Sequence, residues 1–518
     1  MPKPSYITTA IDYTNGAPHI GHAYEKVLAD VIARYHRLKG EEVFFLTGVD
    51  QHGQKVQQSA EKAGVAPQQF VDGITAKFIA LWEKLDVRYG VWAATTDPLH
   101  KECVQGILQR VYDEKQVYKA KQDGYYSVRQ EQFLTDKERG PDGEFGPEWG
   151  QVEHREEENY YFRLAGHKEW LLDYLRSHRD CVTPDFRQTE LINAVEKLSG
   201  DLCISRPKSR LNWGIELPFD PGFVTFVWFD ALTNYISFIG YDPGLSTFNS
   251  QPSTFRDKWP ALHIIGKDIL SPAHGIYWPI MLHALGFPDD QMPKFLVHGW
   301  WNMSGTKMSK SLGNVIDPDA LVGKYGAEAL RYYLMADMAI GQDSDFSEER
   351  LVSRYNSELA NSLGNLLNRA LNMIWKFAEG RLARHGVGVI EARSAYANAM
   401  AGYSIQSGIE RLTELGSLCN QEIDLQKPWA LAKDPSQREQ LAALLYRLAE
   451  SLRVIAILIS PVLPKGAHGI FDQLNWKTAP DLAGQEARFS LADAEWGKLP
   501  DGHLVGKPTP LFPRIEAA

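Results

Sequence analysis

The chain has 518 residues, more than one hydrophobic core usually spans, so we expect several domains. Hydrophobic residues make up 44% and charged residues 23%, as in ordinary globular proteins, and the net charge of −10 argues against a broadly basic protein that coats nucleic acid. None of the four cysteines forms a CxxC pair, which argues against a disulfide framework and against a cysteine zinc site.

The first 50 residues predict a strand–helix–strand unit. Residues 5–13 (SYITTAIDY) are rich in β-branched and aromatic residues and predict a strand, and residues 15–18 (NGAP) predict a turn. Apolar residues then recur at helical spacing to about Lys39, and Gly40 ends the predicted helix. Residues 41–50 (EEVFFLTGVD) are apolar through their middle, which is typical of a buried parallel strand.

The later pattern divides the chain further. Turn-rich, charged sequence predicts an inserted subdomain over residues 115–211, so the α/β domain is split into residues 1–114 and 212–346. From residue 347 to 518 helices replace strands. Two apolar stripes at helical spacing predict the core of a helical bundle. They are Leu359, Leu363, Leu366, Ala370, Met373 and Phe377, and Leu441, Leu444, Leu448, Leu452, Ile455 and Ile459.

The residues HIGH, at positions 19–22, stand at the start of the first predicted helix. A helix N-terminus has unpaired backbone N–H groups and a partial positive charge, which suit a phosphate. His19 and His22 add hydrogen-bond donors, and Gly21 has no side chain to keep a flat base away from the backbone. A motif this short also arises by chance where polar residues begin a helix.

A second motif, TKMSKSLGN at residues 306–314, places Lys307 and Lys310 in a loop of small residues after a predicted strand. Such a loop can hold a triphosphate and neutralise a leaving pyrophosphate, although alone it would be read as a solvated surface loop. The two motifs follow strands in opposite halves of an interrupted α/β domain. Both motifs in this order are far less expected by chance than either motif alone.

HIGH followed by KMSKS resembles the class I aminoacyl-tRNA synthetase family. Four further segments resemble its methionine-specific members: GVDQHGQKV (48–56), ISRPKSRLNWGIELP (204–218), FVWFDALTNYISF (226–238) and IGKDIL (265–270). The resemblance runs from Tyr6 to about Pro464. It implies a Rossmann-type parallel sheet, an inserted subdomain and an all-α anticodon-binding bundle. It also implies a methionine–tRNA ligase that uses Mg-ATP to form methionyl-adenylate and then esterifies initiator and elongator tRNA-Met.

The same resemblance implies roles for individual residues. His19, His22, Lys307 and Lys310 would be catalytic, and the ATP site would also contain Gly21, Gly266 and Asp268. The methionine site would contain Ile11, Tyr13, Asp50, Arg206, Trp228, Ala231, Tyr235 and His274. Asp50 would hold the substrate ammonium, and a hydroxyl or imidazole hydrogen bond to sulfur would help to reject leucine. Without the resemblance, Trp228 and Tyr235 would be read as plain apolar core. The stretch before His274 is one residue longer than the family pattern leads us to expect.

Many members of the family carry a zinc knuckle built from CxxC pairs. Ser127 and Gln130 stand at the cysteine places, and His154 and His167 are isolated, so we expect no zinc. In the helical region the resemblance implies that Asn365, Arg369 and Trp429 read the anticodon.

The ends of the chain give two further expectations. No tRNA-binding barrel follows residue 506, so we expect a monomer. The start lacks the apolar segment of a signal peptide and no apolar run could span a bilayer, so we expect a cytoplasmic protein.

Two alternatives remain open at this point. The first is a catalytically silent tRNA-binding paralogue, although such a protein would have no need of intact HIGH and KMSKS motifs and of Asp50. The second is another class I ligase, specific for isoleucine, valine, leucine or cysteine. The short insertion disfavours the first three amino acids, and the absence of cysteine ligands disfavours the last.

Overall fold

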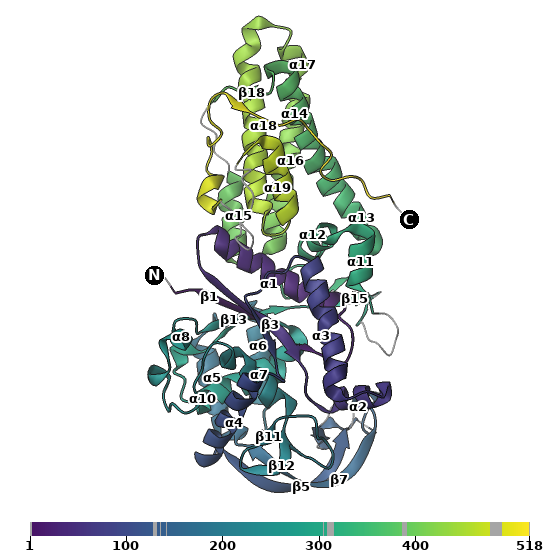
Figure 1. The fold of residues 1–518 in the computed structure, drawn as a ribbon, viewed down its shortest axis with the longest axis vertical. Helices are drawn as coiled ribbons and strands as arrows, with labels where there is room; N and C mark the ends of the chain where they lie inside the picture. Colours follow the sequence, from purple (N-terminus) through teal and green to yellow (C-terminus); the bar gives the residue numbers. More distant parts are fainter. Residues whose placement is uncertain are drawn as a thin grey trace.

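The computed structural model describes residues 3–127, 132–134, 136–140, 142–303, 305–307, 315–385, 391–476 and 489–516. The molecule is elongated: an α/β part lies below a bundle of long helices, and an antiparallel ribbon lies at its lower end (Figure 1). Within the described ranges, no helix combines the length and the apolar character needed to cross a bilayer.

A parallel sheet forms the centre of the α/β part, as predicted. Its strands are β1 (Ser5–Thr9), β2 (Asp12–Tyr13), β3 (Val43–Asp50), β4 (Val91–Ala94), β8 (Val182–Thr183), β13 (Ala261–Gly266) and β14 (Lys294–His298). Across the sheet they run β4, β3, β1, β13, β14, β8, and β2 continues β1 along the same edge of β3. The chain therefore moves outward from β1 in both directions, and the crevice between β1 and β13 is where such sheets bind nucleotides.

Each face of the sheet packs into its own hydrophobic core. Ile7 belongs to the core formed with α1 (Ile20–Leu38), α3 (Pro67–Lys84) and α12 (Ala327–Asp337). Its neighbour Tyr6 belongs to the opposite core, with α4 (Pro98–Asp113), α7 (Val227–Ser237) and α10 (Trp278–Ala284). Successive side chains of a strand point to opposite faces, so a strand with helices on both sides is apolar throughout.

The predicted elements of the first 50 residues form, with one difference. Helix α1 ends at Leu38, and Gly40 has a φ of 85°, the left-handed conformation that glycine adopts without strain after a helix. The predicted strand 5–13 is interrupted at residues 10–11, between β1 and β2. This interruption matters for function, because both residues line the cavity described below.

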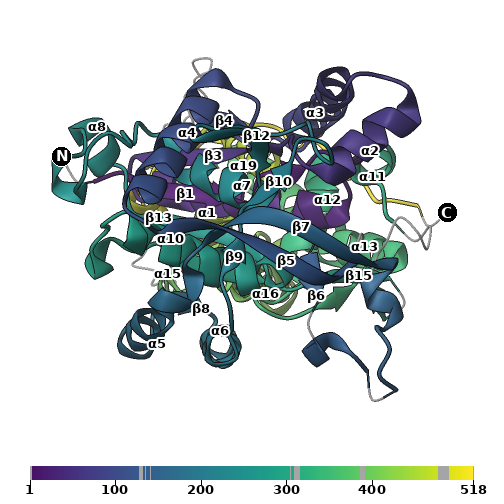
Figure 2. The same cartoon turned by 90° about the horizontal axis from the view of Figure 1, so that it is seen from below.

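The inserted segment forms an antiparallel sheet in the order β6, β5, β7, β9, whose long ribbon is seen from below in Figure 2. These strands are β5 (Val117–Ser127), β6 (Gln132–Leu134), β7 (Val152–Phe162) and β9 (Leu202–Cys203). A three-stranded sheet follows, of β10 (Ser205–Pro207), β11 (Glu216–Leu217) and β12 (Asp220–Thr225). Of the strands within the predicted insertion of 115–211, β8 pairs with β14 of the main sheet, and β10 pairs with β12, which lies beyond residue 211.

The helices after residue 347 form the predicted bundle. They are α13 (Glu348–Arg354), η8 (Tyr355–Gly364), α14 (Asn365–Ala378), α15 (Glu391–Ala401), α16 (Ile405–Gln426), α17 (Pro428–Leu431), α18 (Arg438–Ile459) and α19 (Pro464–Leu474). All six residues of the second apolar stripe and the first four of the first stripe are buried in one core, which continues into the α1 side of the sheet.

A buried arginine on α12 joins α1 to the bundle. The Arg331 guanidinium, fully buried on α12, lies 2.7 Å from an Asp30 carboxylate oxygen of α1. It also donates to the carbonyls of Pro461 (2.9 Å), Val462 (3.0 Å) and Leu85 (2.9 Å). Because the Arg331 charge is paired and its N–H groups are hydrogen-bonded, the free-energy cost of burying the guanidinium is offset. These bonds hold the bundle in a fixed position relative to α1.

Candidate active site

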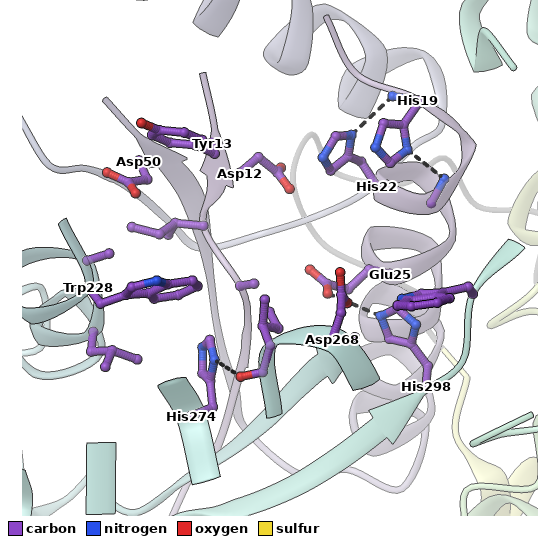
Figure 3. Close-up of a pocket in the computed structure, with 18 of the residues that line it drawn as sticks. Asp12, Tyr13, His19, His22, Glu25, Asp50, Trp228, Asp268, His274 and His298 are labelled. Carbon is purple, nitrogen blue, oxygen red and sulfur yellow. Dashed lines mark hydrogen bonds and ion pairs between the residues drawn. The ribbon is translucent and has the colours of Figure 1, made fainter. Parts of the chain in front are cut away.

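A cavity of about 670 Å³ opens at the carboxyl ends of β2, β3 and β13 (Figure 3). It brings together most of the residues that the sequence singled out. Those that line it are Ile11, Tyr13, His19, Gly21, His22, Asp50, Trp228, Ala231, Tyr235, Gly266, Asp268 and His274. They lie on or beside β2, α1, β3, α7, β13, α9 (Lys267–Ile269) and η5 (Leu270–Tyr277), so the fold brings distant parts of the chain together to form the site.

The two histidines of HIGH cap the helix that they begin. The His19 Nδ1 atom accepts the Gly21 N–H (3.1 Å), and the His22 Nδ1 atom accepts the His19 N–H (3.1 Å). A neutral imidazole whose Nδ1 accepts must carry its proton on Nε2, so each ring can offer an Nε2–H to an anion. The rings stack at 3.8 Å. A Cβ atom at Gly21 would lie only 3.0 Å from His19 Cε1, so glycine allows the His19 ring its capping position.

A carboxylate and an apolar face form the other end of the cavity. Asp50 ends β3, pairs in register with Tyr13 and is 7% exposed, and its Oδ1 lies 3.4 Å from the His52 N–H. Trp228, Ala231 and Tyr235 follow one another on α7 at spacings of three and four residues, which places them on one helix face. A buried carboxylate thus stands beside an aromatic pocket.

His274 lies at the base of this pocket and is held in one tautomer. Its Nδ1–H donates to the Ile269 carbonyl (3.0 Å), so its Nε2 accepts from the Tyr235 hydroxyl (2.8 Å). The surrounding residues 270–277 (η5, Leu270–Tyr277) are π-helical apart from a kink at Ser271, whose φ and ψ of −116° and 127° are not helical, and a π-helical turn holds one more residue than an α-helical turn. Both protons that could reach a thioether sulfur are used within the protein in this structure, contrary to the expected hydrogen bond to sulfur.

Burial lowers the pKa of His274 to about 4, which predicts acid-sensitive stability. Between about pH 6.5 and 4 the unfolded chain binds a proton at this position that the folded chain does not, so the free energy of unfolding falls as pH falls. Relative to His274→Gln, the wild type should lose about 3 kcal/mol of stability across this window. Urea unfolding of both proteins at pH 7 and pH 4.5 measures the difference. Parallel pH dependences would show that folding does not lower the pKa of His274.

The sequence did not single out a charged cluster on the first turns of α1. The buried Lys26 ammonium donates to Asp12 Oδ1 (2.7 Å), Glu25 Oε1 (2.8 Å) and the Ala10 carbonyl (2.9 Å). The second Glu25 oxygen lies 3.1 Å from His298 Nε2. Burial alone would raise the pKa of Glu25, but Lys26 and His298 hold it below its ordinary value, whereas burial raises the pKa of Asp12 to about 7. Asp12, Glu25 and His298 line the cavity, so this cluster contributes to its charge together with Asp50, Lys55 and Asp268 (Figure 3).

Three predicted site residues are not among the described residues that line the cavity. Arg206 is not among the described residues that line the cavity; it is buried with its guanidinium 4.7 Å from the ring of Phe226, which does line it. The backbone of Lys307 lies in β16 (Thr306–Lys307), which pairs with β15 (Trp301–Met303) beyond β14. Lys310 falls outside the residues that the structure describes.

In the bundle, Asn365 begins α14 and is exposed. Arg369 lies one turn further and bonds Asn420 (3.2 Å) and Asp424, both of α16. Trp429, on α17 near the upper end of the molecule, is 47% exposed (Figure 1). An exposed indole of this size is available for stacking, and Asp424 orients the Arg369 guanidinium.

The insertion has polar and aromatic contacts around the position of the expected knuckle. The Ser127 hydroxyl donates to the Trp149 carbonyl (2.6 Å), and the Arg139 guanidinium stacks on Tyr125 (4.7 Å) and Phe145 (4.4 Å). Gln130 lies outside the described residues. His154 packs edge-on against Tyr125, and His167 stacks on Phe162. The expectation of a zinc-free insertion stays a prediction.

Comparison with known proteins agrees with this geometry. A family described as tRNA synthetases class I (M) matches residues 5–142 and 149–371. The methionine–tRNA ligases of Caldanaerobacter subterraneus and Thermotoga maritima are both 41% identical to the chain, over 100% and 99% of it and 80% of their own length. A solved structure of Mycobacterium tuberculosis methionyl-tRNA synthetase in complex with methionyl-adenylate has a TM-score of 0.88 and 35% identity, covering 99% of this chain and 100% of that one. The chain therefore belongs to the class I tRNA synthetases, among the methionine-specific members of that family.

Proposed function

We propose that this chain is a methionine–tRNA ligase and that the cavity between β2 and β13 is its active site. The observation that carries the proposal is the single cavity in which the imidazole pair of HIGH lies with the Asp50 carboxylate and the aromatic face of α7. That combination suits a ligand with an ammonium, an apolar side chain and a phosphate. The related M. tuberculosis enzyme, in complex with methionyl-adenylate, supports it.

Methionine would bind with its ammonium on Asp50, beside Tyr13 and Ile11. Trp228, Ala231, Tyr235 and His274 would surround the thioether, whose polarizable sulfur interacts favourably with aromatic rings. Since the Tyr235 and His274 protons are used within the protein, selection against leucine would rest on pocket shape and on contact between sulfur and the rings. Arg206, whose guanidinium lies against the ring of Phe226, would act on the bound methionine through that ring and not by direct contact.

In the first step a methionine carboxylate oxygen attacks the α-phosphorus of ATP, and the bond to the β-phosphate oxygen breaks. The His19 and His22 Nε2–H groups would stabilise the charge on the α-phosphate, and Lys307 and Lys310 the departing pyrophosphate. Mg²⁺ would enter with ATP as part of the substrate. Gly266 and Asp268, at the end of β13, would contact the adenosine together with Gly21.

In the second step a ribose hydroxyl of the terminal tRNA adenosine attacks the methionyl carbonyl carbon. The bond from that carbon to the phosphate oxygen breaks, AMP leaves, and the hydroxyl proton is released. Asn365, Arg369 and Trp429 would read the tRNA-Met anticodon by base-edge hydrogen bonds and stacking. The same proposal includes a monomeric, zinc-free protein whose chain divides into domains at residues 114, 211 and 346. It also includes the use of both initiator and elongator tRNA.

Exchange of labelled pyrophosphate into ATP, without tRNA and with each of the twenty amino acids in turn, tests this proposal. The expected result is exchange that depends on added amino acid and is strongest with methionine. Exchange with another amino acid would keep the mechanism and overturn the specificity. A folded protein that supports no exchange would instead be the silent tRNA-binding paralogue.

A further inference from the structure

Beyond the residues that contact substrate, a buried carboxylate joins the two halves of the methionine pocket. We propose that Asp230 is a positioning residue, which holds the loop of Asp50 in a fixed relation to helix α7 and so sets the affinity for methionine. This inference rests on the proposed function of the cavity. Asp230 is not among the described residues that line the cavity, so it would act only through its partners.

Asp230 makes two short contacts with imidazole rings from distant parts of the chain. Its Oδ2 lies 2.7 Å from His52 Nδ1, and its Oδ1 lies 2.8 Å from His100 Nε2. The other nitrogen of His100 lies 2.8 Å from the Ser237 hydroxyl. The exposures of His52, His100 and Asp230 are 2%, 0% and 1%. Buried hydrogen bonds of this kind are costly to break, because the unpaired partner has no water to bond.

The protonation of the cluster follows from its geometry. An ionised carboxylate only accepts, so His52 must donate from Nδ1 and His100 from Nε2. With its proton on Nε2, His100 can accept a hydrogen bond from the Ser237 hydroxyl at Nδ1. Burial alone would raise the pKa of Asp230, but the two imidazoles, His52 foremost, hold it below its ordinary value. The carboxylate is therefore ionised and both of its oxygens are used.

The three side chains belong to elements that carry the methionine pocket. His52 follows Asp50 by two residues, and its backbone N–H lies 3.4 Å from Asp50 Oδ1. Asp230 lies on α7 between the pocket residues Trp228 and Ala231. His100 lies on α4 and stacks on Phe238, the C-cap residue of α7. A shift of α7 against the Asp50 loop would lengthen the bonds to Asp230, so these bonds fix the distance from the ammonium site to the thioether site.

The substitution Asp230→Asn tests this role with little change in volume. An asparagine presents one oxygen and one N–H₂ group, so one imidazole N–H would face another donor. The expected result in the pyrophosphate-exchange assay is a KM for methionine raised about 10- to 100-fold, with the KM for ATP within about twofold of wild type. Ser237→Ala is the matched control on the same helix, since it removes the outer hydrogen bond to His100 and a longer one to the Asn234 carbonyl (3.4 Å) and leaves both bonds to Asp230 in place. It should leave the KM for methionine within about twofold.

A second pair of variants keeps the test informative if Asp230→Asn does not fold. His52→Leu removes the donor to Asp230 and should raise the KM for methionine in the same way. His52→Asn offers an amide N–H near the position of Nδ1–H and should restore most of the affinity. Equal values for the leucine and asparagine variants would overturn the proposal, as would parallel increases in the KM for methionine and for ATP.

The outcome separates this inference from the function on which it rests. A wild-type protein without methionine-dependent exchange contradicts the proposed function. A wild type that exchanges normally, beside a folded Asp230→Asn variant with an unchanged KM for methionine, contradicts only the role of Asp230. Loss of thermal stability in that variant without a change in either KM would show that the cluster is structural and would also overturn the inference.

Discussion

Replacing His22 by asparagine is expected to slow adenylate formation by about 10²- to 10³-fold, with little change in the KM for ATP. His22 Nδ1 accepts the His19 backbone N–H, and an asparagine oxygen can take over that helix-capping role. What asparagine lacks is the Nε2–H that would follow the charge on the α-phosphate. A donor needed mainly in the transition state lowers kcat when it is removed and leaves ground-state binding almost unchanged. Single-turnover formation of adenylate from saturating methionine and ATP measures the effect.

The matched variant is His22→Gln, whose longer side chain can place an amide N–H near the position of Nε2. It should retain more activity than His22→Asn, by about tenfold or more, even though asparagine preserves the cap better. If both variants lose activity equally, or if asparagine is the more active, the role of His22 is to build the helix start and not to stabilise the phosphate. Thermal unfolding of both variants distinguishes loss of the cap from loss of the donor.

Replacing Asp50 by asparagine is expected to raise the KM for methionine by about two to three orders of magnitude, while the KM for ATP stays within a few-fold. Asp50 is almost fully buried at the end of β3, and an ammonium in contact with it is shielded from water. Truncating one partner of a buried charge pair costs about 2–5 kcal/mol, because the other charge is left without its partner. Steady-state pyrophosphate exchange at varied methionine concentration measures the change.

A methionine analogue without the amino group provides the control for Asp50. Desamino-methionine has no ammonium to pair, so it should inhibit the wild type and Asp50→Asn with similar constants. A large loss of analogue binding in the variant would mean that Asp50 supports the pocket wall and does not bind the ammonium. An unchanged KM for methionine would place the ammonium elsewhere in the cavity.

Much of the α/β core could be predicted from the sequence because it depends on local patterns. The helical spacing after HIGH predicted α1, and Gly40 marked its end, since a left-handed residue after a helix favours glycine. The continuous apolar run of β3 predicted a strand covered on both faces. The apolar stripes of η8, α14 and α18 likewise predicted a bundle core, because a helix repeats its faces every 3.6 residues.

The residues of the cavity were predicted in a different way. Asp50, Trp228, Tyr235 and His274 came from resemblance to a family, since each alone could be a core residue. The structure places them around one cavity, and the π-helical turn at residues 270–277 brings His274 to Tyr235 despite the additional residue. The hydrogen bonds of this pair, and with them the tautomer of His274, could not be read from spacing, because they depend on which side chains meet.

By itself the sequence determined the motifs, the order of most elements and the residues that bear the chemistry. Only the tertiary structure decided which charges are paired. Lys26 meets Asp12 and shares Glu25 with His298, which lies 273 residues from Glu25 along the chain, and Asp230 meets His52 and His100 across 178 and 130 residues. Periodicity reports which face of an element is buried, whereas the partner of a buried charge is set by the crossing of elements from distant parts of the chain.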